Sequence, residues 1–135
     1  MNTDKVIHIA AAIIEDREGR VLLVRKKNTA FFIQPGGKPE PGESAPAALI
    51  RELKEELQIS VAAESLAFVG QFTDIAANEA NHRLVADIFR LTAPVGEISP
   101  AAEIEETVWL SPDAGDALPL APLTQNQILP LVKQG

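Results

Sequence analysis

Two apolar stretches near the start of the chain predict a pair of strands. Residues 6–15 are apolar and rich in Ile, Val and Ala, and residues 20–26 enclose a Val-Leu-Leu-Val run. Turn-forming residues 16–19 separate the two stretches. Runs of this length bounded by turn residues are typical of buried strands, and the short separation favours pairing of the second strand with the first.

A helix is predicted over residues 44–57. Ser44 is a good N-cap, and Pro46 falls in the first turn, where its missing N–H costs little. Leu49, Leu53 and Leu57 follow at intervals of four residues. They form one apolar stripe along the helix, and this stripe must face a core.

The rest of the chain predicts further strands and a last short helix. The strand-like segments are residues 65–75, 83–92 and 106–110. Thr124 and Gln127 resemble a capping box for the last helix, which Pro130 is expected to kink or shorten. This order of elements predicts an α+β fold, in which helices pack on a mixed β-sheet in a single domain over residues 1–135.

Composition narrows the functions that remain. The chain has 19 acidic and 12 basic residues, a formal charge of −7, and no Cys. This balance argues against binding of long nucleic acid, and the missing Cys excludes disulfides and thiol nucleophiles. The longest apolar run, residues 9–14, is too short to span a membrane, and the N-terminus Met1-Asn2-Thr3-Asp4-Lys5 lacks a signal-peptide layout. We therefore expect a soluble, cytoplasmic protein with no membrane contact.

Three carboxylates lie on one side of the predicted helix. Glu55 and Glu56 follow Glu52 by three and four residues, so the three side chains share an arc of the helix beside the leucine stripe. Like charges at these spacings repel, and the C-terminal half of a helix disfavours anions. One interpretation is an ordinary solvated face. The other is a functional site, because clustered carboxylates suit hard cations such as Mg²⁺ or Mn²⁺.

The loop before the helix favours the functional interpretation. Gly36-Gly37 supplies backbone that a ligand or metal can approach closely. Two prolines and a glycine within residues 38–42 then stiffen a turn that delivers Glu43 to the start of the helix.

Residues 37–59 resemble the signature of the Nudix hydrolases, G-x5-E-x7-R-E-U-x-E-E-x-G-U, where U is a bulky aliphatic residue. The one departure is Gln58, which stands where the signature has Gly. A helix often ends with φ above zero at this place, which costs a residue other than Gly up to ~1–2 kcal/mol. The matching positions are Gly37, Glu43, Arg51, Glu52, Leu53, Glu55, Glu56 and Ile59.

The resemblance implies an α/β/α sandwich and a set of roles. Glu52, Glu55 and Glu56 would bind the metal, Mg²⁺ or alternatively Mn²⁺, with the carbonyl of Gly37. Glu43 and Arg51 would order the loop and helix through ion pairs, with support from Gly36. Glu52 and Arg51 are the catalytic candidates of the signature, and metal-activated water would attack phosphorus in a diphosphate.

A further acid outside the helix is a candidate base. Glu103 closes a Pro-containing loop six residues before Trp109, a spacing that resembles the layout of an extra acidic ligand in MutT-like enzymes. We hypothesise that Glu103 swings in as base or extra ligand when substrate binds. A solvated loop acid is the alternative interpretation.

Three residues are candidates for substrate contact: Arg25, Lys38 and Gln34. Arg25 ends the second strand, near the expected substrate, and Gln34 stands where MutT-like enzymes place an aromatic that helps to form the base pocket. Stacking surfaces are expected only from Phe31, Phe32, Phe72 and Phe89.

The substrate expected from the resemblance is small and nucleotide-like. It is a nucleoside diphosphate linked to another moiety, in particular a nucleoside triphosphate, acted on by a monomer or homodimer. A non-catalytic nucleotide-binding or regulatory module of the same fold is the alternative. Isopentenyl diphosphate isomerisation, which uses this fold, relies on a cysteine that the chain lacks.

Overall fold

The computed structural model describes residues 5–76 and 81–134. Residues 1–4, part of the N-terminus examined for a signal peptide, lie outside the described residues. No helix in the described ranges is long and apolar enough to cross a membrane. The elements are β1 (Lys5–Ile13), β2 (Val21–Lys26), β3 (Gly36–Gly37), α1 (Ala45–Leu57), the 3₁₀ turn η1 (Ala63–Ser65), β4 (Leu66–Ile75), β5 (His82–Leu91), β6 (Ile104–Leu110), the 3₁₀ turn η2 (Pro112–Ala114), the π turn η3 (Thr124–Ile128) and α2 (Leu129–Gln134).

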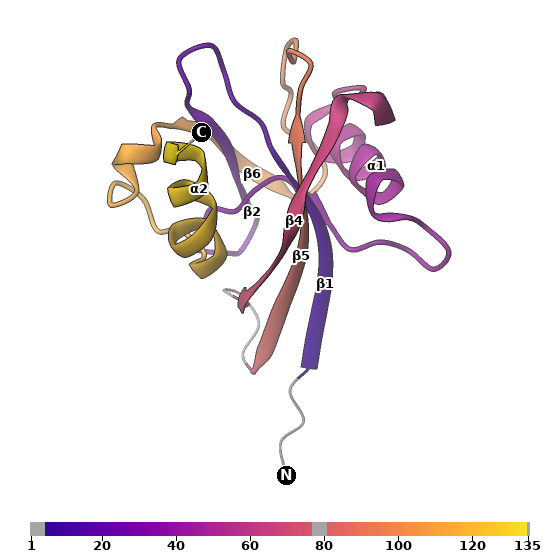
Figure 1. The fold of residues 1–135 in the computed structure, drawn as a ribbon, viewed down its shortest axis with the longest axis horizontal. Helices are drawn as coiled ribbons and strands as arrows, with labels where there is room; N and C mark the ends of the chain where they lie inside the picture. The colour runs from indigo at the N-terminus through magenta and orange to yellow at the C-terminus, as the bar shows by residue number, and fades with distance from the viewer. Residues whose placement is uncertain (1–4, 77–80, 135) are drawn as a thin grey trace.

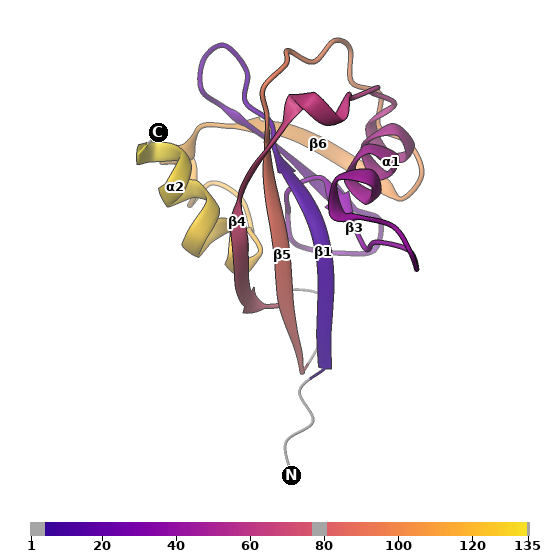
Figure 2. The ribbon, with the colours of Figure 1, turned by 45° about the vertical axis from the view of Figure 1, so that its right-hand side comes forward.

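The strands form a four-stranded mixed sheet and a separate two-stranded sheet. The order in the first is β3-β1-β5-β4, where β1 and β5 are parallel and the other pairs are antiparallel, and the second joins β2 to β6. Figure 1 shows β1, β5 and β4 running side by side between α1 and α2, and Figure 2 shows β3 beyond β1 on the side of α1. The predicted α+β class with a mixed sheet is confirmed.

The predicted pairing of the second strand with the first is wrong. β2 pairs with β6 along its whole length and meets the end of β1 only at a bridge between Glu15 and Val21. Both edges of β1 are already occupied, because β3 pairs with it on one side and β5 on the other. The turn at residues 16–19 therefore carries the chain into a second sheet.

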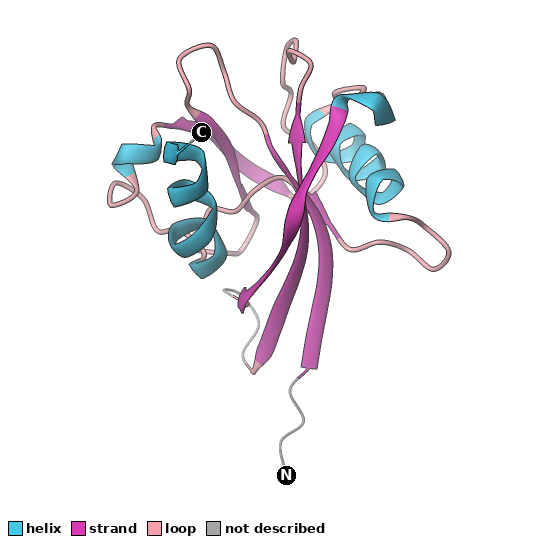
Figure 3. Cartoon of the chain, in the orientation of Figure 1, coloured by secondary structure: helices cyan, strands magenta, loops and turns pink. Residues whose placement is uncertain are grey.

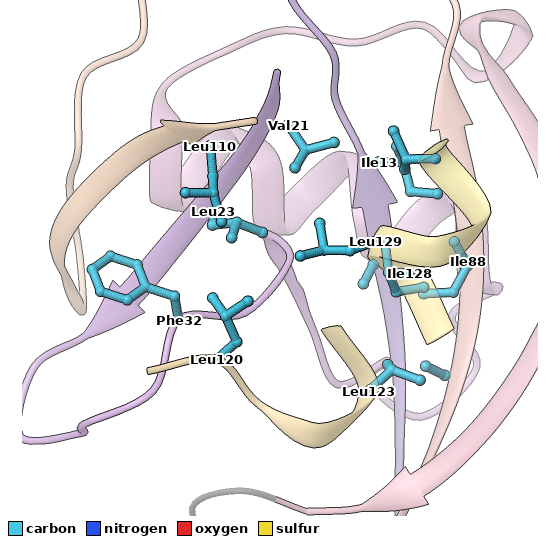
Figure 4. Packing of buried hydrophobic residues seen from close by; sticks show 13 residues of the cluster. Ile13, Val21, Leu23, Phe32, Ile88, Leu110, Leu120, Leu123, Ile128 and Leu129 are labelled. Carbon is cyan, nitrogen blue, oxygen red and sulfur yellow. The ribbon is translucent and has the colours of Figure 1, made fainter. Parts of the chain in front are cut away.

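Alternating side chains of the strands fill two cores. On β1 and the residue after it, Ala10, Ala12 and Ile14 face the core under α1, whereas Ala11 and Ile13 face the core under α2. Figure 4 shows the second core, in which Ile128 and Leu129 pack beside Ile13 and Ile88. The sheets thus lie between two helical layers, as Figure 3 also shows.

Helix α1 begins and ends as the sequence predicts. The Ser44 side chain accepts a hydrogen bond from the Ala47 N–H at 3.2 Å, and the proline lies in the first turn. Leu49, Leu53 and Leu57 are fully buried. Gln58 ends the helix with φ of 58°, and its N–H bonds to the carbonyls of Leu53 and Lys54. The left-handed position that the signature reserves for Gly is therefore occupied here by Gln.

The predicted capping box at Thr124 and Gln127 is wrong. Residue 123 is already helical, so Thr124 does not begin the helix. The Thr124 hydroxyl instead donates to Oε1 of Gln34 at 3.1 Å, and Gln127 donates to the Thr73 carbonyl at 2.6 Å. Pro130 cannot donate a backbone hydrogen bond, and the turn before it widens to a π turn that leads directly into α2.

Candidate active site

A cleft of about 580 Å³ is lined by residues of α1, β1, β2, β3 and β5 and of the segments before β6 and at η3. One part of its lining is acidic, and comprises Glu52, Glu55, Glu56 and Glu103. Another part is aliphatic, and comprises Ile7, Ile9, Ile33, Leu84 and Leu123. Segments far apart in the sequence therefore place charged and apolar surfaces in one hollow.

The leucine stripe sets the rotation of α1 over the cleft. Because Leu49, Leu53 and Leu57 are buried in the core under the helix, the arc that carries the glutamates turns toward β3. The three side chains differ in exposure: that of Glu55 is 55% exposed, that of Glu52 16% and that of Glu56 5%. The exposure of the three carboxylates therefore decreases from Glu55 at the rim of the cleft to Glu56 in its interior.

The two glycines of β3 allow two different close approaches. A Cβ on Gly36 would lie 2.1 Å from the carbonyl oxygen of Ala10, so Gly36 is needed for pairing with β1. A Cβ on Gly37 would lie 2.5 Å from the carboxylate carbon of Glu52. The carboxylate of Glu52 thus sits against the backbone of Gly37, where a side chain would displace it.

Arg51 joins the loop to the helix. Its Nε and Nη2 each donate to the carboxylate of Glu43 at 2.9 Å, and Nη2 also donates to the Lys38 carbonyl at 3.1 Å. The two bonds from Arg51, together with the bond from the Glu40 N–H, lower the pKa of Glu43 to about 2. The expected ion pair between Glu43 and Arg51 is present.

Arg51 also restrains the acids of the cleft. Its Nη1 donates to Glu52 at 3.1 Å and to Glu55 at 3.3 Å. In residues 5–76 and 81–134, no three acidic or histidine side chains are gathered around one point as a metal would require. A cation shared by Glu52, Glu55 and Glu56 would therefore require Glu52 and Glu55 to turn away from Arg51.

Glu56 is the most enclosed acid of the cleft. Its Oε1 accepts from the Gly36 N–H at 3.4 Å, and its Oε2 lies 3.8 Å from Nζ of Lys26. Burial raises the pKa of Glu56 to about 7, the charge of Lys26 opposes this rise, and the charges of Glu52 and Glu103 add to it. Glu56 therefore takes up a proton more readily than an exposed glutamate, chiefly because it is buried.

Glu103 lies at the cleft without any movement of its loop. The loop is tied to the end of α1 by the bond from the Ala101 N–H to the Glu56 carbonyl at 2.9 Å. The Glu103 carbonyl accepts from the Lys27 N–H at 2.8 Å. The backbone of Glu103 is therefore anchored beside the carboxylates of the cleft.

The three expected substrate contacts lie in different places. Lys38 and Gln34 line the cleft, and so does Lys26, which sequence reasoning did not select. Arg25 does not line it: its Nε donates to Glu106 at 2.9 Å and its Nη1 to the Thr29 carbonyl at 2.8 Å. Successive residues of a strand point to opposite faces, which turns Lys26 toward the cleft and Arg25 away from it.

The expected aromatic stacking surfaces are absent from the described lining of the cleft. Phe32 and Phe89 are buried in the two cores, and Phe72 packs against the core under α2. The apolar wall is instead aliphatic, built from β1, β5 and the segment before η3.

The donor set fits a hard divalent cation. Carboxylate and backbone carbonyl oxygens are the ligands that such cations prefer, and both are present in the lining of the cleft. The buried position of Glu56 beside two other acids is unfavourable for the protein alone and is relieved by a cation.

Comparison with known proteins identifies the family. A model of the NUDIX domain matches residues 6–132. The CTP pyrophosphohydrolase of Escherichia coli is 35% identical over 123 residues, which cover 87% of this chain and 85% of that protein. The ADP-ribose pyrophosphatase of Methanocaldococcus jannaschii is 30% identical over 105 residues, which cover 74% of this chain and 60% of that protein. The chain belongs to the NUDIX family.

Solved structures agree with this assignment. The MutT protein from Methanosarcina mazei superposes with a TM-score of 0.80 at 21% identity, covering 99% of this chain and 97% of that one. The MutT NUDIX hydrolase from Burkholderia pseudomallei superposes with a TM-score of 0.74 at 25% identity, covering 96% and 98%. The first likeness shows the fold alone. The protein is a Nudix hydrolase, and none of these relatives supports the non-catalytic alternative.

Proposed function

We propose that this Nudix hydrolase cleaves a diphosphate linkage in a nucleoside triphosphate or related nucleotide, as a single domain over residues 1–135. The observation that carries the proposal is the division of the cleft into a carboxylate corner and an aliphatic wall. A nucleotide has the same division, because its phosphates need cations and the two faces of its base are apolar. The Escherichia coli relative, of which 85% is covered, is named as a CTP pyrophosphohydrolase, and CTP is a nucleoside triphosphate.

Nudix hydrolases depend on divalent metal, and we propose Mg²⁺, with Mn²⁺ as a substitute. Glu52, Glu55 and Glu56, with the Gly37 carbonyl, would hold it. When bound, the metal supplies charge neutralisation for the phosphates and a more acidic water. Arg51 acts as a positioning residue, because its bonds fix Glu43 and the loop beneath the site.

The residues of the chain supply the remaining steps. Lys26 and Lys38 line the cleft and bind phosphate oxygens, which favours Lys26 over Arg25 as the phosphate contact of β2. The Glu103 carboxylate accepts a proton from the attacking water. The water oxygen bonds to phosphorus as the bond from phosphorus to the bridging oxygen breaks, and the leaving phosphate takes the electron pair.

The lack of Cys fits a cytoplasmic location, where small nucleotides are available. We propose that location and a monomer or homodimer as the active form. Sedimentation with and without nucleotide would distinguish the two states.

The proposed function is tested by phosphate and pyrophosphate release from a panel of nucleotides. The panel includes the four ribonucleoside triphosphates and ADP-ribose, each with Mg²⁺, with Mn²⁺ and with EDTA. We expect turnover of at least one triphosphate with metal and none with EDTA. The carboxylates and the phosphates are both negatively charged, so a cation is needed between them. Full turnover in EDTA, or no turnover of any nucleotide with either metal, would contradict the proposal.

A further inference from the structure

A buried amide with an unused donor lines the cleft. Gln34 is 5% exposed, and its Oε1 accepts from the Thr124 hydroxyl at 3.1 Å. Its Nε2 is buried and has no hydrogen-bond partner among the described residues. Leaving a buried donor unpaired destabilises a folded protein, so such groups are rare and usually have a partner that binds later.

Thr124 determines which end of the amide is available. Thr124 is fully buried on the π turn η3 and also lines the cleft. Because its hydroxyl donates to Oε1, the amide group of Gln34 keeps its N–H donors for another partner. The pair therefore offers the cleft a hydrogen-bond donor of fixed orientation.

The surroundings of this donor fit a nucleobase. Ile7 on β1 pairs with Leu84 on β5, and both line the cleft. Ile7 lies three residues along β1 from Ala10, the partner of Gly37, which is a separation of about 10 Å. A ribose with its phosphates can span this distance between the carboxylate corner and the aliphatic wall. When the phosphates lie at the carboxylate corner, the base of the same nucleotide therefore reaches the aliphatic wall of the cleft.

The acceptor on the base is best supplied by a carbonyl oxygen. Such an oxygen projects from the ring and carries two lone pairs, so it can reach a recessed N–H group. Cytosine and guanine each carry one such oxygen and uracil carries two, whereas the acceptors of adenine are ring nitrogens and its one exocyclic group is an amino donor. An amide that presents only donors therefore disfavours adenine.

We propose that Gln34 donates a hydrogen bond from Nε2 to a carbonyl oxygen of the substrate base, and that Thr124 is the positioning residue that orients this amide. The inference rests on the proposed hydrolysis of nucleotides. It assigns the enzyme a preference for nucleotides whose base carries a carbonyl group over adenine nucleotides.

The test compares Gln34→Met with the wild type on CTP, UTP, GTP, ATP and the base-free ribose 5′-triphosphate. The substitution keeps the length of the side chain and removes the amide. We expect kcat/KM to fall on CTP by roughly tenfold more than on ribose 5′-triphosphate, mainly through KM, because one neutral hydrogen bond is lost. Gln125→Met, on the exposed side of the same turn, is the matched control and should behave as wild type.

Two variants test the orienting role of Thr124. Thr124→Val keeps the shape but removes the hydroxyl, so the amide can rotate and the preference for CTP over ATP should shrink. Thr124→Ser restores the hydroxyl and should recover most of that preference. A merely structural role would instead lower kcat/KM on every substrate by the same factor and leave the ratio unchanged.

A binding measurement separates this inference from the proposed function. Titration calorimetry in EDTA compares CMP, AMP and ribose 5-phosphate, and needs no turnover. We expect tighter binding of CMP than of AMP, and loss of that difference in Gln34→Met. Equal binding of the two nucleotides by wild type, or a preference for AMP, would overturn the inference even if hydrolysis is observed. Absence of nucleotide hydrolysis together with selective binding would instead contradict only the proposed function.

Discussion

The two helical layers of this protein differ in how they treat charge. Helix α1 carries Glu52, Glu55 and Glu56 toward a cleft, where one of them is buried and its pKa is raised to about 7. The segment η3 and helix α2 on the other face have one charged residue, Lys133, and bury Ile128 and Leu129 completely or almost so. In the proposed function the first layer carries the charged groups of the reaction, whereas the second contributes packing and, through Thr124, one contact of the cleft.

The comparison predicts opposite responses to substitution in the two layers. On the α1 side, Glu56→Gln should lower kcat/KM at least about 100-fold, because one of the carboxylates proposed to bind the metal is lost. The thermal stability of this variant in metal-free buffer should be unchanged or slightly raised, since a buried charge beside other acids is removed. Nucleotide hydrolysis and melting curves measure both effects. Wild-type kinetics would assign Glu56 no part in the reaction.

On the α2 side, Ile128→Ala should reduce the free energy of unfolding by roughly 2–5 kcal/mol, because the side chain is fully buried. Its kcat below the melting transition should stay close to that of wild type. Denaturant unfolding and initial rates measure the two quantities. Ile128→Val is the control, with an expected loss of about 0.5–1.5 kcal/mol. A large fall in kcat of Ile128→Ala with unchanged stability would contradict the view that this layer contributes mainly packing.

Glu103 tests whether chemistry extends beyond α1. Glu103→Gln should lower kcat at least ~10-fold, the lower part of the range for loss of a general base, with little effect on KM. Glu97→Gln is the matched control, because Glu97 is an exposed acid of the same connection and lies outside the cleft. Equal kcat in Glu103→Gln and wild type would assign the base role to Glu52 or to another acid of the loop.

The smallest effect is expected at the end of α1. Gln58→Gly should raise the free energy of unfolding by up to ~1 kcal/mol, because φ at this position is 58° and Gly adopts such values without steric strain. Gln58→Ala retains the Cβ and should not give this gain. Chemical denaturation of the three proteins measures the difference. A less stable Gln58→Gly would mean that the Gln side chain contributes more than the backbone strain costs.

The sequence predicted best what depends on neighbouring residues. The N-cap at Ser44, the leucine stripe and the left-handed Gln58 all follow from local geometry, and the structure has them. The loop contact between Glu43 and Arg51 also lies within one short segment. These are the parts on which the family signature rests.

The errors concern contacts between distant segments. Pairing of β2 with β6 could not be derived from the turn after β1, because the turn does not show that β5 and β3 occupy both edges of β1. Thr124 was assigned to a helix cap, although its hydroxyl bonds to Gln34, ninety residues away in the chain. The sequence predicts Arg25 as a substrate contact, whereas Lys26 lines the cleft, because the residues of β2 that face the cleft depend on the sheet that β2 joins.

The neighbours of β1 also have a consequence for folding. Its residue Ala10 pairs with Gly37, whereas Ile7 pairs with Leu84 much further along the chain. Contacts between near segments close smaller loops and form faster than contacts between far ones. During synthesis, β1, β3 and α1 can therefore associate before β5 has left the ribosome. Until β5 arrives, β1 exposes an unpaired edge to other chains, and its parallel pairing with β5 is the step that ends this exposure.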